Sequence, residues 1–486
     1  MTQCIILTGT NSKGPAVKTA GPHRIATQVR QAGYTAQVID ISFVSSLDHL
    51  MLILKKFLST DTLWIGLSNT FLTRFCGVKW AGMESRNNAK MISIMQQFVD
   101  RVRQKHPQVR FVYGNSGLRQ DITETGFIKF EGFVDQEILD FTHNCSDPNF
   151  QPSNQYQREY TGFSSSTITW TANDLFNDEK AVPIEISRGC IFRCDFCRFP
   201  LNGKKKFDYI KDLDVLYGEF MHNYENFGIK DYIFTDDTFN DSMHKLREIE
   251  KVTNRLPFQI NFVSYIRLDL MMRHHDMVPL LRDLGLISAT LGIETAVPEN
   301  AKLIGKNVDF HKQMEFLREL KQGQWKDINT SSGFIVGLPY DDMDKVNWLF
   351  EFLFGDDNPL DNFIVATLQI YPTDRYDLTY SSIIDKDYAK LGYRFVSNDM
   401  GYEHWVNDRT GLDEITLNKM TRDSDTRKRA ISKYTGFEVM DLQNIGVSKQ
   451  DLLTLTMQQL DEKYDTDRLL QENYKRYLNR LMRLKD

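Results

Sequence analysis

The sequence predicts an α/β protein in which two parallel-sheet domains follow one another and a mostly helical region ends the chain. Strand-length apolar runs alternate with helix-length segments over residues 1–145, and the alternation resumes over residues 181–380. Residues 146–180 are polar and rich in Ser, Thr, Asn and Tyr, which predicts a linker. Residues 381–486 end in segments of helical periodicity. At 486 residues the chain is too long for one ordinary core, so several domains are expected.

The first domain is predicted to be Rossmann-like, with a doubly wound parallel sheet. Its candidate strands are Cys4–Leu7, Ala36–Ile41, Leu63–Leu67 and Val109–Tyr113. Polar loops follow three of these strands, at Gly9–Gly21, Ser68–Thr70 and Gly114–Gly117. Loops that follow parallel strands gather at the carboxyl edge of the sheet, where such sheets bind ligands. This edge is therefore the predicted ligand site of the first domain.

The second domain is predicted to be a parallel barrel, complete or partial. Its six candidate strands are Ile184–Ile186, Tyr232–Thr235, Gln259–Tyr265, Ser288–Gly292, Gly333–Val336 and Phe363–Ile370. Helical segments lie between them, at Leu213–Phe220, Ser242–Arg255, Met277–Leu284, His311–Gln322 and Asp344–Phe352. In a barrel of this kind, the active site lies at the carboxyl ends of the strands.

The composition is that of a soluble cytoplasmic protein. It is 41% hydrophobic and 26% charged, and no apolar run reaches the roughly 18 residues of a membrane span. The start of the chain, MTQCIILTGTNSKG, lacks the features of a signal peptide. The net charge of −6 argues against broad nucleic-acid binding. Six cysteines, three of them clustered, favour a metal site in a reducing compartment over a disulfide scaffold.

Three cysteines lie on one short stretch at the start of the second domain, IEISRGCIFRCDFCRFP. Cys190, Cys194 and Cys197 have the spacing C-x3-C-x2-C. Three thiolates on one loop suit a soft metal, either zinc or an iron–sulfur cluster. A structural zinc site needs four protein ligands, and no Cys or His follows close by to complete one. A four-iron cluster held by three cysteines keeps one iron open to an exchangeable ligand.

With Phe196 before its last cysteine, this loop resembles the radical S-adenosylmethionine (SAM) superfamily. The resemblance implies a 4Fe–4S cluster on the three cysteines, with SAM chelating the open iron. It also implies that an electron from an external donor, such as flavodoxin or ferredoxin, cleaves SAM to methionine and a 5′-deoxyadenosyl radical. The family fold is a partial (β/α)6 barrel, in agreement with the six candidate strands. The alternative is a zinc loop, or three core cysteines, in a non-catalytic metal-binding scaffold protein.

Acidic residues follow the second candidate strand, in the sequence TDDTFND. By position, Asp236, Asp237 and Thr238 resemble the family motif that holds the amino group of SAM, although the family form is Gly-Gly-Glu. Carboxylate and hydroxyl oxygens can accept hydrogen bonds from an ammonium group. Without the upstream cysteines, a turn with solvated aspartates would explain the same residues.

Two further strand ends carry charged candidates. Arg267, at the end of the third strand, could pair with a carboxylate of SAM, and an ordinary salt bridge would explain it as well. The fourth strand ends in LGIETAVPENAKLIGK, which resembles a family stretch that hydrogen-bonds the ribose or amino-acid part of SAM. The resemblance implies that role for Glu294 and a structural role for Lys306.

The fifth strand, SSGFIVGLPYDD, resembles the family stretch that contacts adenine. Gly333, Ile335 and Gly337 match it, and glycines there would let the backbone approach the base. The acidic residue of that stretch is shifted to Asp341, which puts its role in doubt.

Residues 1–145 resemble the cobalamin-binding domain that precedes many radical SAM cores. The matching segments are GPHRIATQVRQAGYTAQVIDI, WIGLSNTF, VYGNSG and FEGFVDQEILDF. The D-x-H-x-x-G signature is absent, and His23, near the first loop, is more typical of a structural residue than of a metal ligand. With cobalamin, the resemblance implies methylation or rearrangement of an unknown substrate. Without cobalamin, the first domain would instead serve to bind the substrate of a radical SAM enzyme.

The remaining cysteines are Cys4, Cys76 and Cys145, far apart in the sequence. They could hold a second cluster, but unrelated core or surface thiols explain them better. In the C-terminal region, Ser448 is predicted to cap a helix over 449–464. A following apolar stripe, which includes Tyr474 and Tyr477, is predicted to lie in a core or against a partner.

Overall fold

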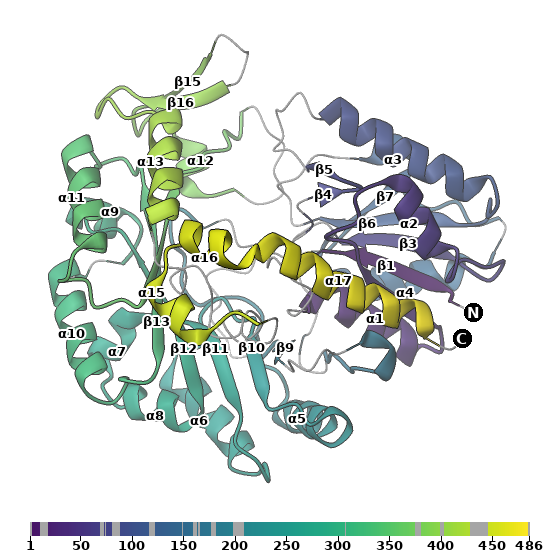
Figure 1. Cartoon of the computed structure of the whole chain (residues 1–486), viewed down its shortest axis with the longest axis horizontal. Coiled ribbons are helices and arrows are strands. Elements are labelled where there is room, and N and C mark those ends of the chain that lie inside the picture. Colours follow the sequence, from purple (N-terminus) through teal and green to yellow (C-terminus); the bar gives the residue numbers. More distant parts are fainter. Residues whose placement is uncertain are drawn as a thin grey trace. The chain divides into compact units, whose positions relative to one another are not determined.

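The computed structural model divides into two compact units (Figure 1). Unit 1 comprises Met1–Pro183, His222–Ile229 and Asp467–Asp486, and unit 2 comprises Ile184–Met221 and Lys230–Thr466. The residues described are 2–9, 18–68, 72, 74–79, 88–115, 122–147, 149–158, 163, 166–175, 181–197, 209–306, 308–374, 381–398, 403–427 and 446–484. Within this part of the chain, no helix is long and apolar enough to cross a membrane.

Unit 1 contains a six-stranded parallel sheet with the strand order β2-β1-β3-β6-β7-β8. The strands are β1 (Cys4–Thr8), β2 (Ala36–Asp40), β3 (Trp64–Ser68), β6 (Arg110–Asn115), β7 (Phe127–Gly132) and β8 (Gln155–Arg158). The order reverses at β1, as in a doubly wound sheet, so the Rossmann-like prediction is confirmed. The strand β8 lies inside residues 146–180, which the sequence predicted as a linker.

Helices cover both faces of this sheet. They are α1 (Ala20–Gln31), α2 (Leu47–Leu54), α3 (Asn88–Arg103), α4 (Asp135–Asn144) and α17 (Thr466–Arg483), and a short hairpin, β4 (Arg74–Phe75) and β5 (Val78–Lys79), follows β3. Successive residues of β1 point to opposite faces of the sheet. Ile5 packs with residues of α2, α3 and α17, whereas Cys4 packs with residues of α1 and α4. Burial on both faces explains the continuous apolar runs that predicted these strands.

The last helix, α17, belongs to unit 1 although it ends the chain. Its Tyr474, Tyr477 and Leu481 are buried in the core beside α2 and α3. The Tyr474 hydroxyl donates to the carbonyl oxygen of Asp40 at 2.7 Å, and the Asp40 amide donates to the Tyr477 hydroxyl at 3.0 Å. The apolar stripe of this helix therefore completes a core, as the sequence predicted.

A second six-stranded parallel sheet has the order β14-β13-β12-β11-β10-β9, and its strands belong to unit 2 except for Ala181–Pro183 of β9. The strands are β9 (Ala181–Ile184), β10 (Asp231–Phe234), β11 (Asn261–Ile266), β12 (Leu286–Glu294), β13 (Asn329–Val336) and β14 (Asn362–Thr367). The connecting helices are α5 (Leu213–Phe227), α6 (Met243–Thr253), α7 (Leu268–Arg273), α8 (Met277–Asp283), α9 (Pro298–Leu303), α10 (Phe310–Gln322) and α11 (Met343–Phe354). Since β9 and β14 are the two edges, the barrel is partial.

Side chains alternate between two environments along these strands. On β14, Phe363 and Val365 are buried, whereas Ile364 between them is 59% exposed. On β11, Ser264 and Ile266 are buried, whereas Tyr265 is 56% exposed. The sheet therefore keeps one face under the helices and one more open face.

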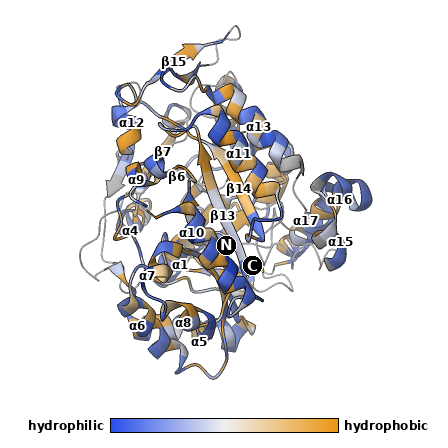
Figure 2. Ribbon diagram, turned by 90° about the vertical axis from the view of Figure 1, so that its left-hand side faces the viewer, coloured by the Kyte–Doolittle hydropathy of each residue, from blue (hydrophilic) through white to orange (hydrophobic). Residues whose placement is uncertain are grey.

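The C-terminal region of unit 2 is partly helical. It contains α12 (Ile383–Asp387), the antiparallel hairpin β15 (Tyr393–Ser397) and β16 (Glu403–Asn407), α13 (Glu414–Arg427), α15 (Lys449–Thr454) and α16 (Met457–Tyr464). Figure 2 shows mainly apolar residues along β14 and mixed polar and apolar residues on α13 and α16. Ser448 caps a helix as predicted, but the helix ends at Thr454 and Thr456 caps a second one. The hairpin was not predicted.

Candidate active site at the carboxyl ends of the second sheet

The loop that follows β9 carries the three cysteines. Its backbone is fixed at both ends: the Arg188 amide donates to the carbonyl oxygen of Tyr209 at 2.8 Å, and Gly189 has a φ of 102°. Farther along, the Cys197 amide donates to the Cys194 carbonyl oxygen at 3.0 Å and forms a turn. The carbonyl oxygen of Asp195 accepts from two amides at the start of α12. The loop is thus tied to the rest of unit 2 on both sides of Cys194.

The three thiols are free and lie near one another. Cys190 is buried, whereas Cys194 and Cys197 are half-buried. Burial raises the pKa of the Cys194 thiol; the cations Lys306 and Arg267 oppose that rise, and the other two thiols add to it. Among the described residues, no three Cys, His, Asp or Glu side chains form a single-ion site. The donor set, three soft sulfur ligands on one turn with cations nearby, fits a 4Fe–4S cluster.

The two neighbouring aspartates after β10 have different surroundings. Asp236 is fully buried: its carboxylate accepts from the Ile186 amide at 3.1 Å and from the Ser187 hydroxyl, and it pairs with Lys245 at 3.0 Å. Asp237 is half-buried, and burial together with the Asp236 charge raises its pKa to about 7. Asp237 is therefore the more available of these two predicted contacts.

Thr238 touches the cysteine loop directly. Its Oγ1 lies 3.5 Å from the Sγ of Cys190, and this contact lowers the pKa of that thiol, against the larger effect of burial. Phe196 is half-buried within the cysteine turn. The structure thus brings Thr238 to the predicted metal ligands, while Phe196 remains a prediction from the resemblance.

Arg267 is held by a bidentate ion pair. Its Nε and Nη2 donate to the two carboxylate oxygens of Asp269 at 2.9 and 2.8 Å, and its guanidinium carbon lies 3.9 Å from the centre of the Phe192 ring. The side chain therefore supports the cysteine loop through cation–π contact and places a positive charge beside Cys194.

Glu294 ends β12 in an unusual backbone conformation, with a φ of 71°. A non-glycine residue in the left-handed region is strained, and such strain is concentrated at functional sites. Burial raises the pKa of Glu294, and the charges of Lys306 and Arg267 oppose the rise. The ammonium of Lys306 donates to the carbonyl oxygen of Gly292 at 2.8 Å, so it fixes the strand end that carries Glu294.

Tyr265 lies among the predicted site residues, although the sequence analysis did not name it. Desolvation raises the pKa of the phenol, and the charges of Asp237 and Glu294 raise it further, so the phenol lies near both carboxylates although the residue is 56% exposed. Its exposed position on β11 could have been found from strand alternation, because its neighbours Ser264 and Ile266 are buried.

The residues of the predicted adenine stretch have two kinds of surroundings. A Cβ on Gly333 would meet no atom within 4 Å, so this position is open. Gly337 has a φ of 90°, and a Cβ there would lie 2.6 Å from the indole of Trp405. Asp341 accepts from the amides of Gly337 and Leu338 at 2.8 and 3.0 Å and from the Asn300 side chain at 2.6 Å. Gly337 and Asp341 therefore shape the turn after β13.

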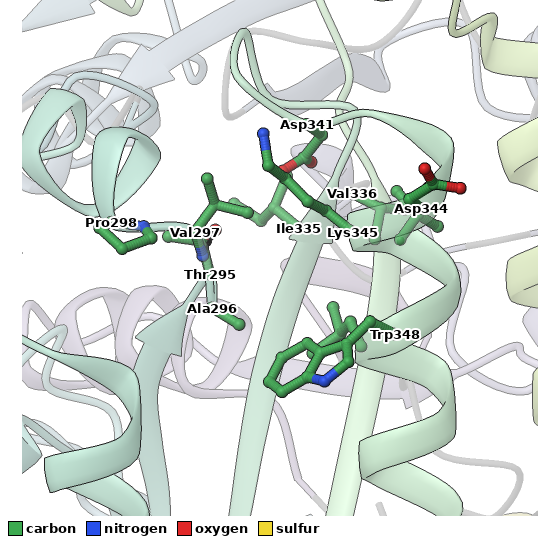
Figure 3. Close-up of a pocket in the computed structure, with 12 residues that line it drawn as sticks. Thr295, Ala296, Val297, Pro298, Ile335, Val336, Asp341, Asp344, Lys345 and Trp348 are labelled. Carbon is green, nitrogen blue, oxygen red and sulfur yellow. Dashed lines mark hydrogen bonds between the residues drawn. The ribbon is translucent and has the colours of Figure 1, made fainter.

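A cavity of about 330 Å³ lies beside this turn (Figure 3). Its walls are mostly apolar and come from Thr295–Pro298, from the end of β13 and from α11, whose Trp348 closes one side. Ile335 is among the lining residues, which joins this predicted adenine contact to the cavity.

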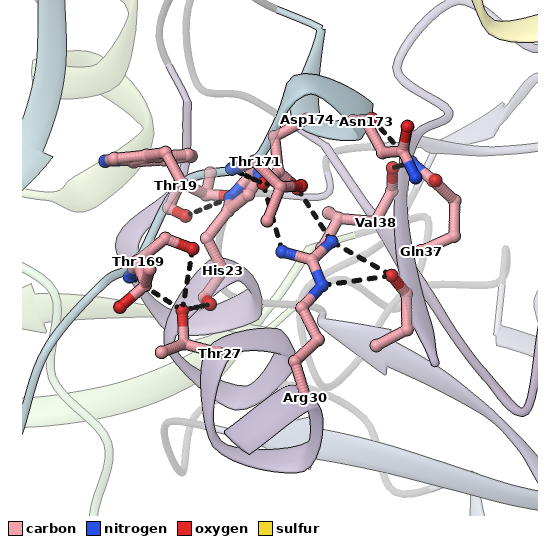
Figure 4. Close-up of polar contacts among 12 residues, drawn as sticks. Thr19, His23, Thr27, Arg30, Gln37, Val38, Thr169, Thr171, Asn173 and Asp174 are labelled. Atoms are coloured by element: carbon pink, nitrogen blue, oxygen red, sulfur yellow. Dashed lines mark hydrogen bonds and ion pairs between the residues drawn. The ribbon is translucent and has the colours of Figure 1, made fainter. Parts of the chain in front are cut away.

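In unit 1, the residues near the first loop serve packing. His23 is buried, its Nδ1 donates to the Thr19 carbonyl oxygen at 2.8 Å, and its ring lies 4.5 Å from that of Trp170. Burial lowers the pKa of His23 to about 4, so the ring is neutral. Figure 4 shows Arg30 of α1 paired with Asp174, at 2.9 Å. The predicted loops of this domain lie largely outside the described residues, at 10–17, 69–71 and 116–121.

The other three cysteines do not form one group. Cys4 belongs to the core of α1 and α4, against which Cys145 packs, whereas Cys76 belongs to the core on the opposite face of the sheet. Burial raises the pKa of all three thiols. These are the properties of core thiols, as the sequence analysis favoured.

The fold and the site together define a class of protein. A partial parallel barrel with a C-x3-C-x2-C loop after its first strand, and charged residues at the ends of the next three, is the arrangement expected of a radical SAM core. Residues 184–353 match the family described as the Radical SAM superfamily. Residues 184–353 of this enzyme therefore form a radical SAM domain, as predicted.

Solved structures of similar fold are known. The chain is similar to the radical SAM methyltransferase TsrM of Kitasatospora setae, with a TM-score of 0.58 and 15% identity over 82% of this chain and 79% of that chain. It is also similar to the cobalamin-dependent radical SAM enzyme OxsB, with a TM-score of 0.58 and 12% identity over 99% and 80% of the two chains. Identities this low establish the fold alone.

Two curated relatives match shorter regions. An uncharacterized methyltransferase of Pyrococcus horikoshii is 23% identical over 46% of this chain and 47% of its own length. The anaerobic magnesium-protoporphyrin IX monomethyl ester cyclase of Cereibacter sphaeroides is 27% identical over 32% of this chain and 25% of its own length. The chain thus spans at most about half the length of these relatives.

Proposed function

We propose that this enzyme holds one 4Fe–4S cluster on Cys190, Cys194 and Cys197, binds SAM beside it, and methylates or rearranges an unidentified substrate. The observation that carries the proposal is the convergence of three free thiols with Asp237 and Glu294 at one edge of the barrel sheet. When bound, the cluster would supply the electron that cleaves SAM. The reductant would be an external electron donor such as flavodoxin or ferredoxin.

The residues of this chain would position SAM. Asp237 is suited to accept hydrogen bonds from the amino group, because Asp236 is already bonded to Ser187 and Lys245. Glu294 lies at the end of β12, where it could accept from a hydroxyl or ammonium group of SAM. Gly333 offers open backbone for a flat base.

Arg267 would act through the cysteine loop. Both of its strongest contacts are to Asp269, so it is better suited to orient Phe192 and to balance thiolate charge than to bind SAM directly. Tyr265, which lies near both carboxylates, would face the substrate or SAM from the open side of the sheet.

Cobalamin is the cofactor we propose for unit 1, which would make methyl transfer the first candidate reaction. The doubly wound sheet supports this proposal, as do the similar folds solved with cobalamin. His23 would not be an axial ligand, because its ring is buried and packs against the ring of Trp170. The second candidate is a radical SAM enzyme without cobalamin, in which unit 1 binds the substrate.

Anaerobic reconstitution tests the proposal. The purified chain is supplied with iron, sulfide and a reductant, and 5′-deoxyadenosine is measured after incubation with SAM. Formation of this product supports the proposal, and its absence from protein with a full complement of iron and sulfide contradicts it. Incubation with hydroxocobalamin, followed by gel filtration, separates the two candidates, because retained cobalamin is visible in the absorption spectrum.

A further inference from the structure

We infer that Lys245 of α6 is a positioning residue that joins the cysteine loop to the loop after β10 and so fixes Cys190 for cluster binding. This inference rests on the proposed function. It assigns a task to a cation that lies outside the cysteine motif and that follows the acidic motif by several residues.

Lys245 is buried in the first turn of its helix. Its side chain has no exposed surface, and its amide is capped by the hydroxyl of Ser242 at 3.2 Å. A buried ammonium is costly unless it is paired and hydrogen-bonded. A lysine at this position therefore requires partners in fixed places.

The ammonium contacts both loops. It donates to the Ser187 hydroxyl at 2.7 Å, three residues before Cys190, and to the Thr238 carbonyl oxygen at 3.1 Å. Thr238 is also the residue whose hydroxyl lies 3.5 Å from the Cys190 sulfur. One ammonium thus contacts a side chain three residues ahead of this cysteine and the backbone of the residue whose hydroxyl touches its thiol.

Asp236 completes the connection. Its carboxylate lies 3.0 Å from the ammonium and accepts from the Ile186 amide and from the Ser187 hydroxyl. Three groups, the ammonium, the carboxylate and the Ser187 hydroxyl, therefore contact one another in the same buried space. A shift of residues 186 and 187, at the start of the cysteine loop, would break these bonds.

The Lys245 ammonium also lies near a second buried carboxylate, that of Asp241. Asp241 lies 3.6 Å from it and accepts from the Tyr209 hydroxyl at 3.0 Å. Two buried carboxylates thus share one cation, and its removal would leave both without charge compensation. Groups that orient metal ligands in this way typically change metal affinity by about 10- to 100-fold when they are replaced.

The test measures how fast iron leaves the reconstituted protein when an anaerobic chelator is added. Lys245→Met is expected to release iron at least about tenfold faster than the wild type. Ser187→Ala removes one hydroxyl and leaves the Lys245–Asp236 pair in place, so this variant should fold. It should release iron a few-fold faster than the wild type. It should also change the electron paramagnetic resonance spectrum of the reduced cluster.

The control is Lys211→Met. Lys211 pairs with Glu219 at 2.6 Å in the same unit, and both side chains are almost fully buried, as are those of Lys245 and Asp236. The Lys211 amide donates to the Ile186 carbonyl oxygen at 2.9 Å, and a change of side chain leaves this backbone bond available. This variant should lose comparable stability to urea and yet keep the wild-type rate of iron release and the wild-type spectrum.

Two results would overturn the inference. One is iron release at the wild-type rate from both Lys245→Met and Ser187→Ala. The other is equally fast release from Lys211→Met, which would show that any loss of stability has this effect. A wild-type protein that takes up no iron and sulfide would instead contradict the proposed function, so the two failures are distinguishable.

Discussion

The polar side chains of the two parallel sheets serve different purposes. In unit 2, carboxylates and cations at the strand ends lie beside three thiols, and Glu294 holds a strained backbone there. In unit 1, the neutral His23 ring and the Arg30–Asp174 ion pair hold α1 against residues 169–174. The two units therefore differ in what supports their proposed cofactors. Side chains of unit 2 support the 4Fe–4S cluster, whereas the fold of unit 1 supports cobalamin.

The largest expected effect comes from the thiols. Cys194→Ala should abolish 5′-deoxyadenosine formation, by about a thousandfold or more, because the cluster loses one of three ligands. Cys145→Ala, in unit 1, should leave the rate unchanged, because Cys145 packs against an apolar core. Product is measured by chromatography after anaerobic reconstitution. Equal activity in both variants would erase the proposed difference between the two sheets.

The two glycines of β13 and its following turn should differ in stability. Gly337→Ala should lower the free energy of unfolding by about 3 kcal/mol, since its Cβ would meet Trp405 and its φ is positive. Gly333→Ala should change it by less than about 1 kcal/mol, because the position is open. Urea denaturation measures both. If Gly333→Ala weakens SAM binding without loss of stability, this result supports the prediction that Gly333 contacts adenine.

Replacement of His23 tests the role of unit 1. His23→Ala should cost about 2 kcal/mol of stability, because the ring loses its packing on Trp170 and its hydrogen bond to Thr19. The absorption spectrum of any bound cobalamin should stay the same. A shifted spectrum in the variant would mean that His23 ligates the metal, against the packing role described above.

The smallest effect is a pH dependence of SAM binding. Burial and the Asp236 charge raise the pKa of Asp237 to about 7, so acidification below that pH protonates the group that would accept from the amino group of SAM. The dissociation constant should therefore rise by about fivefold between pH 7 and pH 6. Asp237→Asn should bind more weakly and lose this dependence. Calorimetric titration of the reconstituted protein at several pH values measures both; an unchanged profile in the variant would contradict the assignment.

Much of this could be predicted from the sequence because the signals are local. Strand and helix alternation predicted both sheets, and the cysteine spacing predicted the site. What failed depends on contacts between distant residues. Residues 155–158 form β8 by pairing with β7, although their polar composition indicated a linker. Nor can the motif tell Asp236 from Asp237, since the difference comes from Lys245 on the following helix. Tyr265 was missed because its nearness to Asp237 and Glu294 depends on the pairing of β11 with β10 and β12, which its own sequence does not show.

The most direct test of the central claim is an assay of iron and acid-labile sulfide in protein purified without oxygen, with spectra recorded before and after SAM is added. The account predicts about four iron atoms and four sulfides per chain, and a reduced-cluster resonance spectrum that changes when SAM binds the open iron. Zinc in place of iron, or a cluster spectrum indifferent to SAM, would contradict it.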